Sequence, residues 1–284
     1  MFYFAIRNLQ LFFKDKGAVF LAFLAQLIVV GLYILFMRKN LLESFPALPQ
    51  AERIMDSWMI AGLLGIAPVT TTMGAFGIMV EDRGRDIQRD FVSSPVSRVS
   101  LFSGYLLGAV AVSLLLSVAL FLGARLYLLH AYQMRLETET VMKVYGLLIF
   151  NAMSSASMVL LLVSFIKSNH ALVSCCTILG SLIGFLTGIY LPVGSLPEEV
   201  QCLIKAFPIS HGVALFRQLL LMPFWEKGFA GEETQAAQQF KAFMGVEYAV
   251  GDRRISPTES VLILGIGALV CFFLAVVREE QEVN

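Results

Sequence analysis

Six long apolar segments constrain what this 284-residue chain can fold into. A helix needs about 20 apolar residues to cross the roughly 30 Å hydrocarbon core of a bilayer. Segments of about that length that carry no charged residue are 17–37, 57–80, 101–124, 144–166, 171–191 and the shorter 261–277. The chain is 57% hydrophobic and 15% charged, whereas soluble domains carry about 25% charged residues. The sequence therefore predicts an all-α, polytopic membrane protein with six transmembrane helices, as a single domain over residues 1–284.

An even number of spans places both termini on one side of the membrane, and the basic residues favour the cytoplasmic side. The segments that would then be internal hold Arg7, Lys14, Lys16, Arg83, Arg85, Arg89, Arg98, Lys167 and Arg278. The short external loops hold Arg38, Lys39, Arg53, Arg125, Arg135 and Lys143. The sequence thus predicts a plasma-membrane protein with cytoplasmic termini. Lys+Arg and Asp+Glu balance at 21 each, which argues against nucleic acid as a partner.

The spacing of apolar and polar residues in 1–16 predicts an amphipathic helix that lies in the membrane interface. Phe2, Ile6, Leu9 and Phe13 fall on one face, with Arg7, Gln10 and Lys14 on another. Such a helix serves either as a simple anchor before the first span or as a surface that also touches a cytoplasmic partner.

The loop 81–100 is the most charged part of the chain. Its charged residues include Glu81, Asp82, Arg83, Arg85, Asp86, Arg89 and Asp90. A mixture of signs suits a complementary protein surface, while composition alone favours a solvated loop.

Small residues recur at the spacing used in helix packing. Gly104 and Gly108 lie four apart in the third span, and Gly180, Gly184 and Gly188 repeat that spacing in the fifth. Close approach of helix backbones explains such a pattern, either within the chain or at the seam of a dimer.

Residues 192–260 follow the fifth span. Ser195 and Glu198 have the spacing of a capping box, and Phe207-Pro208 separates two apolar helical segments that are each too short to span. We expect two half-inserted outer helices, followed by a polar cap. The histidines, including His211, are expected at the membrane edges.

Catalytic and nucleotide-binding motifs are missing from the sequence. The chain holds no G-x-x-x-x-G-K-[ST], H-E-x-x-H or G-x-S-x-G pattern, which argues against its own ATP site or an intramembrane hydrolase. Ion-coupled carriers usually keep a charged residue within their spans. A transporter with chargeless spans needs an external energy source.

Two segments resemble the permease subunits of ABC-2 type exporters. One is Glu81…Gly84…Ser94-Pro95-Val96-Ser97-Arg98…Gly104, and the other is Gly188-x-Tyr190-x-Pro192, Leu196-Pro197, Phe207-Pro208 and Arg217. The six spans, the amphipathic N-terminus and the length agree, so the resemblance covers essentially the whole chain.

The resemblance implies a permease that pairs with a second permease chain, identical or different, and with ABC ATP-binding subunits. ATP and Mg²⁺ would bind to those subunits, with no cofactor in this chain. The charged residues of the 81–90 stretch, with Arg7 and Lys14, would form the interface with the ATPase. The outer gate would include Tyr190, Pro192, Pro197, Pro208 and Arg217.

The resulting hypothesis is a non-enzymatic subunit that exports an amphipathic or hydrophobic substrate, such as a drug, an antimicrobial peptide or a lipid-like molecule. The alternative is an ion- or proton-coupled secondary transporter or channel that needs no ATPase.

Overall fold

The computed structural model describes residues 2–46, 48, 50–85, 98–228, 235–251 and 253–281. Six of its helices are long and apolar enough to cross a membrane: Lys16–Ser44, Ala51–Gly84, Ser100–Tyr132, Thr138–Ser164, Asn169–Leu186 and Pro257–Arg278. The all-α, six-span prediction is confirmed. The first, second, third and sixth helices extend beyond the predicted apolar runs at both ends, whereas the fourth ends at Ser164 and the fifth at Leu186, before the predicted bounds of 166 and 191.

The first half of the chain forms three spans. An N-terminal helix, α1 (Phe2–Lys14), precedes a first span made of α2 (Lys16–Leu32), a π-helical turn η1 (Tyr33–Met37) and α3 (Arg38–Ser44). The second and third spans are α4 (Ala51–Gly84) and α6 (Arg98–Tyr132).

The second half alternates spans with shorter elements. After α7 (Thr138–Ser164) and α8 (Asn169–Leu186) come the 3-10 turn η2 (Val193–Ser195), α9 (Glu198–Ala206), α10 (Pro208–Gly228) and α11 (Gln235–Phe243). Strands β1 (Ala249–Val250) and β2 (Arg253–Arg254) form an antiparallel hairpin. The last span is α12 (Pro257–Gln281).

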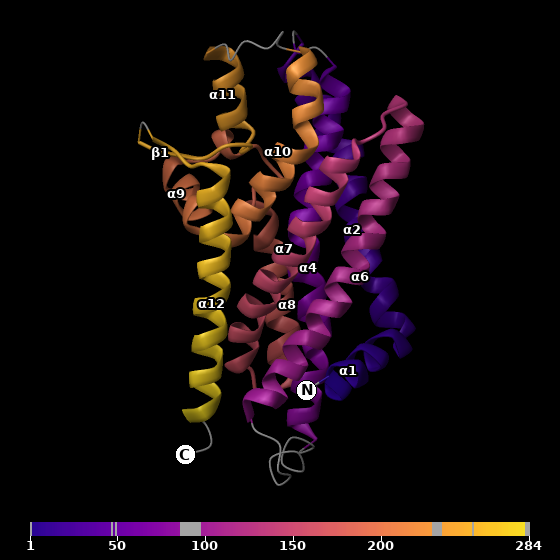
Figure 1. The fold of residues 1–284 in the computed structure, drawn as a ribbon, viewed down its shortest axis with the longest axis vertical. Coiled ribbons are helices and arrows are strands. Elements are labelled where there is room, and N and C mark those ends of the chain that lie inside the picture. Colours follow the sequence, from indigo (N-terminus) through magenta and orange to yellow (C-terminus); the bar gives the residue numbers. More distant parts are fainter. Residues whose placement is uncertain are drawn as a thin grey trace.

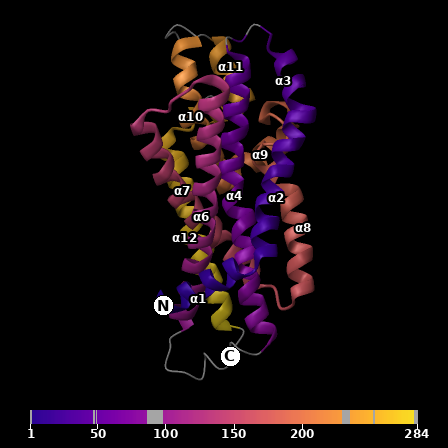
Figure 2. The same ribbon diagram turned by 90° about the vertical axis from the view of Figure 1, so that its right-hand side faces the viewer.

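Helix α4 is the centre of the bundle. In its most apolar stretch 78% of the residues are buried, against 11% for the first span and 17% for α8 and α12. Figure 2 shows α4 in the middle, with α2 and α8 to one side and α6 and α7 to the other. The peripheral helices expose large apolar side chains such as Phe20, Leu27 and Leu269. A bilayer would cover these residues, since water-soluble proteins rarely expose apolar surface continuously.

The two ends of the bundle differ in their elements. Helix α1 and the last turns of α12 lie at one end, called here the terminal end (Figure 1). Helices α3 and α11 lie at the other, called here the far end (Figure 2). Helix α8 stops at Leu186, and the chain turns at Gly188, whose φ is +63°. A left-handed conformation of this kind favours glycine.

The outer helices differ from the expectation in two respects. They separate at Phe207-Pro208 as predicted, but α10 has 21 residues, a length that can span a bilayer. It begins at about mid-height of the bundle and runs to the far end, as Figure 1 shows. The predicted capping box is wrong, because Ser195 belongs to η2 and its hydroxyl donates to the Pro192 carbonyl.

Candidate functional site: three buried charged clusters

A three-residue cluster joins three helices at the terminal end. The guanidinium of Arg7 on α1 donates to both carboxylate oxygens of Asp82 on α4, at 2.8 and 3.0 Å. The hydroxyl of Tyr105 on α6 donates to the same carboxylate at 2.8 Å. The side chain of Asp82 is 5% exposed and that of Arg7 is 34% exposed. A bidentate pair of this kind fixes orientation as well as distance.

Two glycines let α1 lie close enough to form this cluster. A Cβ atom at Gly104 would lie 2.7 Å from Cδ1 of Phe4, and one at Gly108 would lie 2.9 Å from Cβ of Asn8. The ring of Phe4 also meets Tyr105 edge-on at 4.7 Å. Gly104 and Gly108 therefore pack within the chain, which is the first of the two explanations for their spacing.

The hydrogen bond to Asp82 is the largest contribution that raises the pKa of Arg7.

On α1, Asn8 and Phe12 are buried, while Phe2 and Ile6 on the predicted apolar face are 73% and 49% exposed. The arrangement lets one face of α1 contact the bundle and leaves Phe2 and Ile6 exposed for lipid.

The other residues of the predicted coupling interface lie in different surroundings. Arg83 donates to the carbonyl of Ile166 at 2.7 Å, beyond the end of α7. Glu81 and Arg85 form an exposed ion pair, and Lys14 is exposed. Asp86, Arg89 and Asp90 lie outside the described residues. Asp82 itself is buried, and its carboxylate accepts hydrogen bonds from Arg7 and Tyr105, so its place in the interface with the ATPase stays a prediction.

A second cluster, toward the far end, surrounds Asp56 on α4. Oδ1 accepts hydrogen bonds from the hydroxyl of Tyr33 and from Nε of Arg38, at 2.8 and 3.0 Å. Oδ2 accepts from the hydroxyls of Tyr127 and Tyr132, both at 2.5 Å. The cluster ties the first span to α4 and α6. Tyr33 is the first residue of the π-helical turn, and such turns often occur at functional sites.

Sequence reasoning missed the Asp56 cluster. Asp56 precedes the apolar run 57–80 by one residue and was treated as part of a loop, although the helix begins at Ala51. No local pattern identifies the cluster, because the partners of Asp56 come from two other spans.

The third cluster surrounds Arg217 on α10, one of the predicted gate residues. Its side chain is fully buried. One terminal nitrogen donates to the carbonyl of Gly188 at 2.7 Å, and the other to that of Gly245 at 3.2 Å. The guanidinium carbon lies 4.6 Å from the ring centre of Trp58, whose Nε1 donates to the carbonyl of Met244. Burial lowers the pKa of Arg217 to about 10, so the group stays charged at neutral pH and carbonyl dipoles and the ring stabilise it.

Both glycines beside Arg217 are needed for their backbone conformation. Gly188 and Gly245 have φ values of +63° and +66°, and a Cβ atom at Gly245 would lie 2.8 Å from Nη1 of Arg217. Gly188 is thus a turn residue, which corrects its prediction as a helix-packing glycine. Gly184 packs against the ring of Tyr190, while a Cβ atom at Gly180 would meet nothing within 4 Å.

The remaining gate residues are spread around this turn. Tyr190 is half-buried, Pro192 is buried, and Pro197 is an exposed N-cap of α9. Pro208 is the first residue of α10 and contacts α12, since a Cβ atom at Gly267 would lie 2.7 Å from its ring. Burial raises the pKa of Tyr190. The structure places Tyr190, Pro192 and Arg217 near one turn, and Pro197 away on the surface.

His211 on α10 is a buried group that the sequence did not predict to be buried. It is 0% exposed, with Nε2 2.9 Å from the carbonyl of Lys205 and Nδ1 3.2 Å from the hydroxyl of Ser260. Because a carbonyl only accepts, Nε2 carries the proton and Nδ1 accepts. Desolvation lowers the pKa of His211. The side chain is therefore packed within the protein, beside Ser260 near the start of the last span.

Comparison with known proteins places this architecture in a family. A family model described as ABC-2 family transporter protein matches residues 44–277, which is most of the chain. None of the curated proteins compared with the chain matches it. The matched region begins at the end of α3 and includes the spans from α4 to α12. The chain therefore belongs to the ABC-2 transporter family, as a multi-pass membrane permease of an ABC transporter.

Proposed function

We propose that this permease is the translocating half of an ATP-driven exporter whose energy comes from a separate ABC ATP-binding subunit. The cluster of Arg7, Asp82 and Tyr105 carries the proposal. It ties α1 to the last turns of α4 and the first turns of α6, which residues 86–97 connect in the sequence. A displacement of that connection or of α1 would be transmitted to the centre of the bundle, since α4 is its most buried span.

The terminal end faces the cytoplasm in this proposal. The internal segments hold nine basic residues against six in the short external loops, which supports that orientation through the positive-inside rule. The exposed Lys14, Glu81 and Arg85 then lie on the side of the ATPase. ATP and Mg²⁺ would bind to the ATPase, because this sequence has no phosphate-binding glycine-rich loop followed by Lys and Ser or Thr.

A second permease chain would complete the pathway. The open surface at Gly180 on α8 supports a seam there, because α8 is only 17% buried and small residues favour close approach of helices. The substrate class we propose is amphipathic or hydrophobic, which fits spans whose middle sections carry no charge.

The alternative, an ion-coupled carrier, lacks a supporting feature among the described residues. Its coupling would need a carboxylate able to exchange protons or ions. Asp56 and Asp82 are the buried carboxylates of the described helices, and each is held by an arginine and at least one tyrosine.

The test is reconstitution with and without the ATPase. The chain is co-expressed with an ABC ATP-binding subunit encoded beside it, and the complex is placed in inside-out vesicles. Uptake is measured for a lipophilic cationic dye, an amphipathic peptide and a fluorescent phospholipid. We expect at least one probe to be taken up only when ATP and a hydrolysing ATPase are both present. Uptake by the chain alone, driven by a pH or sodium gradient, would support the alternative.

A further inference from the structure

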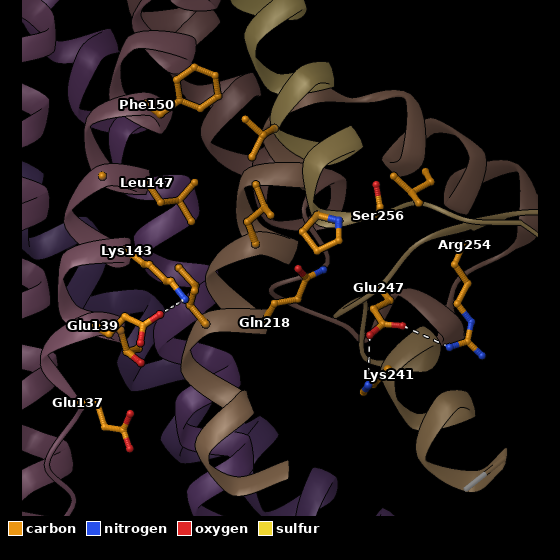
Figure 3. Close-up of a pocket in the computed structure, with 17 residues that line it drawn as sticks. Glu137, Glu139, Lys143, Leu147, Phe150, Gln218, Lys241, Glu247, Arg254 and Ser256 are labelled. Atoms are coloured by element: carbon orange, nitrogen blue, oxygen red, sulfur yellow. Dashed lines mark ion pairs between the residues drawn. The ribbon is translucent and has the colours of Figure 1, made fainter. Parts of the chain in front are cut away.

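A cleft between α7, α10 and α12 is not used by the mechanism proposed above. Its volume is about 1030 Å³, at the upper end of the range for small-molecule sites. Figure 3 shows α7 on one side of the cleft and the segment of Lys241, Glu247 and Arg254 on the other. Its floor is apolar, formed by Leu147, Phe150, Leu215, Leu219 and Val261.

The α7 wall changes character along its length. Glu139 and Lys143 in its first turns form an ion pair at 2.6 Å, and Leu147 and Phe150 follow on the same face of the helix. These four residues cover about 16 Å along the axis. The wall is therefore charged at the end of the span and apolar toward the membrane centre, as a lipid is charged at its head and apolar along its chains.

The opposite wall also carries both signs of charge. Glu247 pairs with Lys241 at 3.2 Å and with Arg254 at 3.8 Å. Each wall thus offers a cation and a carboxylate to one ligand. These charges are already paired within each wall, Glu139 with Lys143 and Glu247 with Lys241 and Arg254. The lining carries three cations, Lys143, Lys241 and Arg254, and three carboxylates, Glu137, Glu139 and Glu247, so a head with both charges and no net charge complements it better than a purely anionic head.

The cleft opens where lipid chains would lie. Val261 is 40% exposed, and Gly146 is exposed, with nothing within 4 Å of a Cβ atom added there. Both residues belong to helices that cross the membrane by length and composition. Around them, Met142, Ile149 and Leu262 expose between 47% and 65% of their surface. An acyl chain can therefore enter sideways, which a soluble or peptide ligand does not need.

We propose that this cleft binds a bilayer phospholipid with a zwitterionic phosphate–ammonium head. The head lies between the two charged walls, and an acyl chain packs on the apolar floor between α7 and α12. The site depends on α7 and α12 spanning the membrane. It does not depend on the direction of transport or on the ATPase, so either proposal can fail alone.

The experiment uses the full chain in nanodiscs that contain a trace of phosphatidylethanolamine with a photoreactive diazirine on its acyl chain. After irradiation, the labelled peptides are identified by mass spectrometry. We expect labelling of residues 142–150 and 257–262 to exceed that of the equally exposed peptide around Phe20 and Leu27 by about tenfold. Unlabelled phosphatidylethanolamine should compete, and diacylglycerol with the same chains should compete about tenfold less.

Two matched substitutions test the position of the lipid. Gly146→Phe adds a ring at the cleft, where a Cβ atom meets nothing within 4 Å, and should reduce the labelling about tenfold, whereas Gly123→Phe on α6, where a Cβ atom also meets nothing, should leave it unchanged. Lys143→Gln should reduce the preference for phosphatidylethanolamine over diacylglycerol.

Three results would overturn the proposal: equal labelling of the cleft and the α2 peptide, equal competition by diacylglycerol, or displacement by an amphipathic peptide but not by phosphatidylethanolamine. These competition results come from the unmodified chain, so they hold even if a variant fails to fold.

Discussion

At the residue scale, Asp82 is a charged residue whose sequence context indicates a loop, although in the structure it belongs to a helix. Its sequence neighbours are charged, so composition alone suggested a solvated segment. In the structure Asp82 belongs to the last turn of α4 and accepts three hydrogen bonds from α1 and α6. The partner Arg7 lies 75 positions away in the sequence, and no local pattern specifies a pair of that separation.

Replacing Asp82 with Asn should destabilise the protein by about 1–3 kcal/mol. Breaking a buried ion pair costs more, about 3–5 kcal/mol, but the partly exposed Arg7 can regain water. Tyr105→Phe should cost about 1 kcal/mol. Midpoints of denaturant unfolding in detergent measure both effects. Glu81→Gln, one position away in an exposed pair, is the control, and a loss equal to that of Asp82→Asn would contradict the account.

Replacing Arg217 with Met should cost about 2–4 kcal/mol, since the carbonyls of Gly188 and Gly245 would each lose a buried donor. Arg217→Lys should not restore stability, because one ammonium group cannot reproduce the two-pronged geometry. The measurement is the midpoint of thermal inactivation, with the exposed Arg85→Met as control. Wild-type stability of Arg217→Lys would show that charge alone is sufficient.

His211 makes stability depend on pH. Its pKa is lowered in the folded state, while the unfolded histidine titrates near 6.5, about the ordinary value. The contribution of His211 to the stability of the folded state is therefore complete above about pH 6.5. It is lost as the pH falls through that value, because the unfolded chain then binds more protons than the folded one. We expect His211→Gln to reduce the change in the midpoint temperature of thermal inactivation between about pH 7.5 and 5.5. The exposed His170→Gln should leave the slope unchanged, and an unchanged slope in His211→Gln would refute this origin.

At the element scale, the contact of α1 with α6 depends on two glycines. Gly108→Leu should push α1 away, because even a Cβ atom there lies 2.9 Å from Asn8. Gly123→Leu, on the same helix where a Cβ atom meets nothing, is the matched control. Hydrogen exchange of α1 peptides should rise by about tenfold in the first variant only. Equal exchange in both variants would mean that α1 is held by other contacts.

The elements were predictable to different degrees. The six spans follow from the length of apolar runs, because a bilayer fixes the length of a helix that crosses it. The break at Phe207-Pro208 follows from proline chemistry. The length of α10 and the turn at Gly188 did not follow, because the contacts of Arg217 on α10 with the carbonyls of Gly188 and Gly245 join segments that are distant in the sequence. The same holds for Asp56, whose partners come from two other spans.

At the scale of the whole molecule, the bundle has a buried ion pair of α4 near each end. Asp82 ties α4 to α1 and α6, and Asp56 ties it to the first span and α6. Helix α4 is thus fixed near both ends to the same neighbour. A movement of α1 or of the α4–α6 connection would carry α4 and α6 together as one body.

The number of molecules transported per ATP hydrolysed, compared between the wild-type complex and Tyr105→Phe and Asp82→Asn complexes, tests this coupling most directly. We expect that the ATPase still binds and hydrolyses ATP in both variants, while the ratio falls, and falls further in Asp82→Asn. An unchanged ratio in Asp82→Asn, with the complex intact, would contradict it.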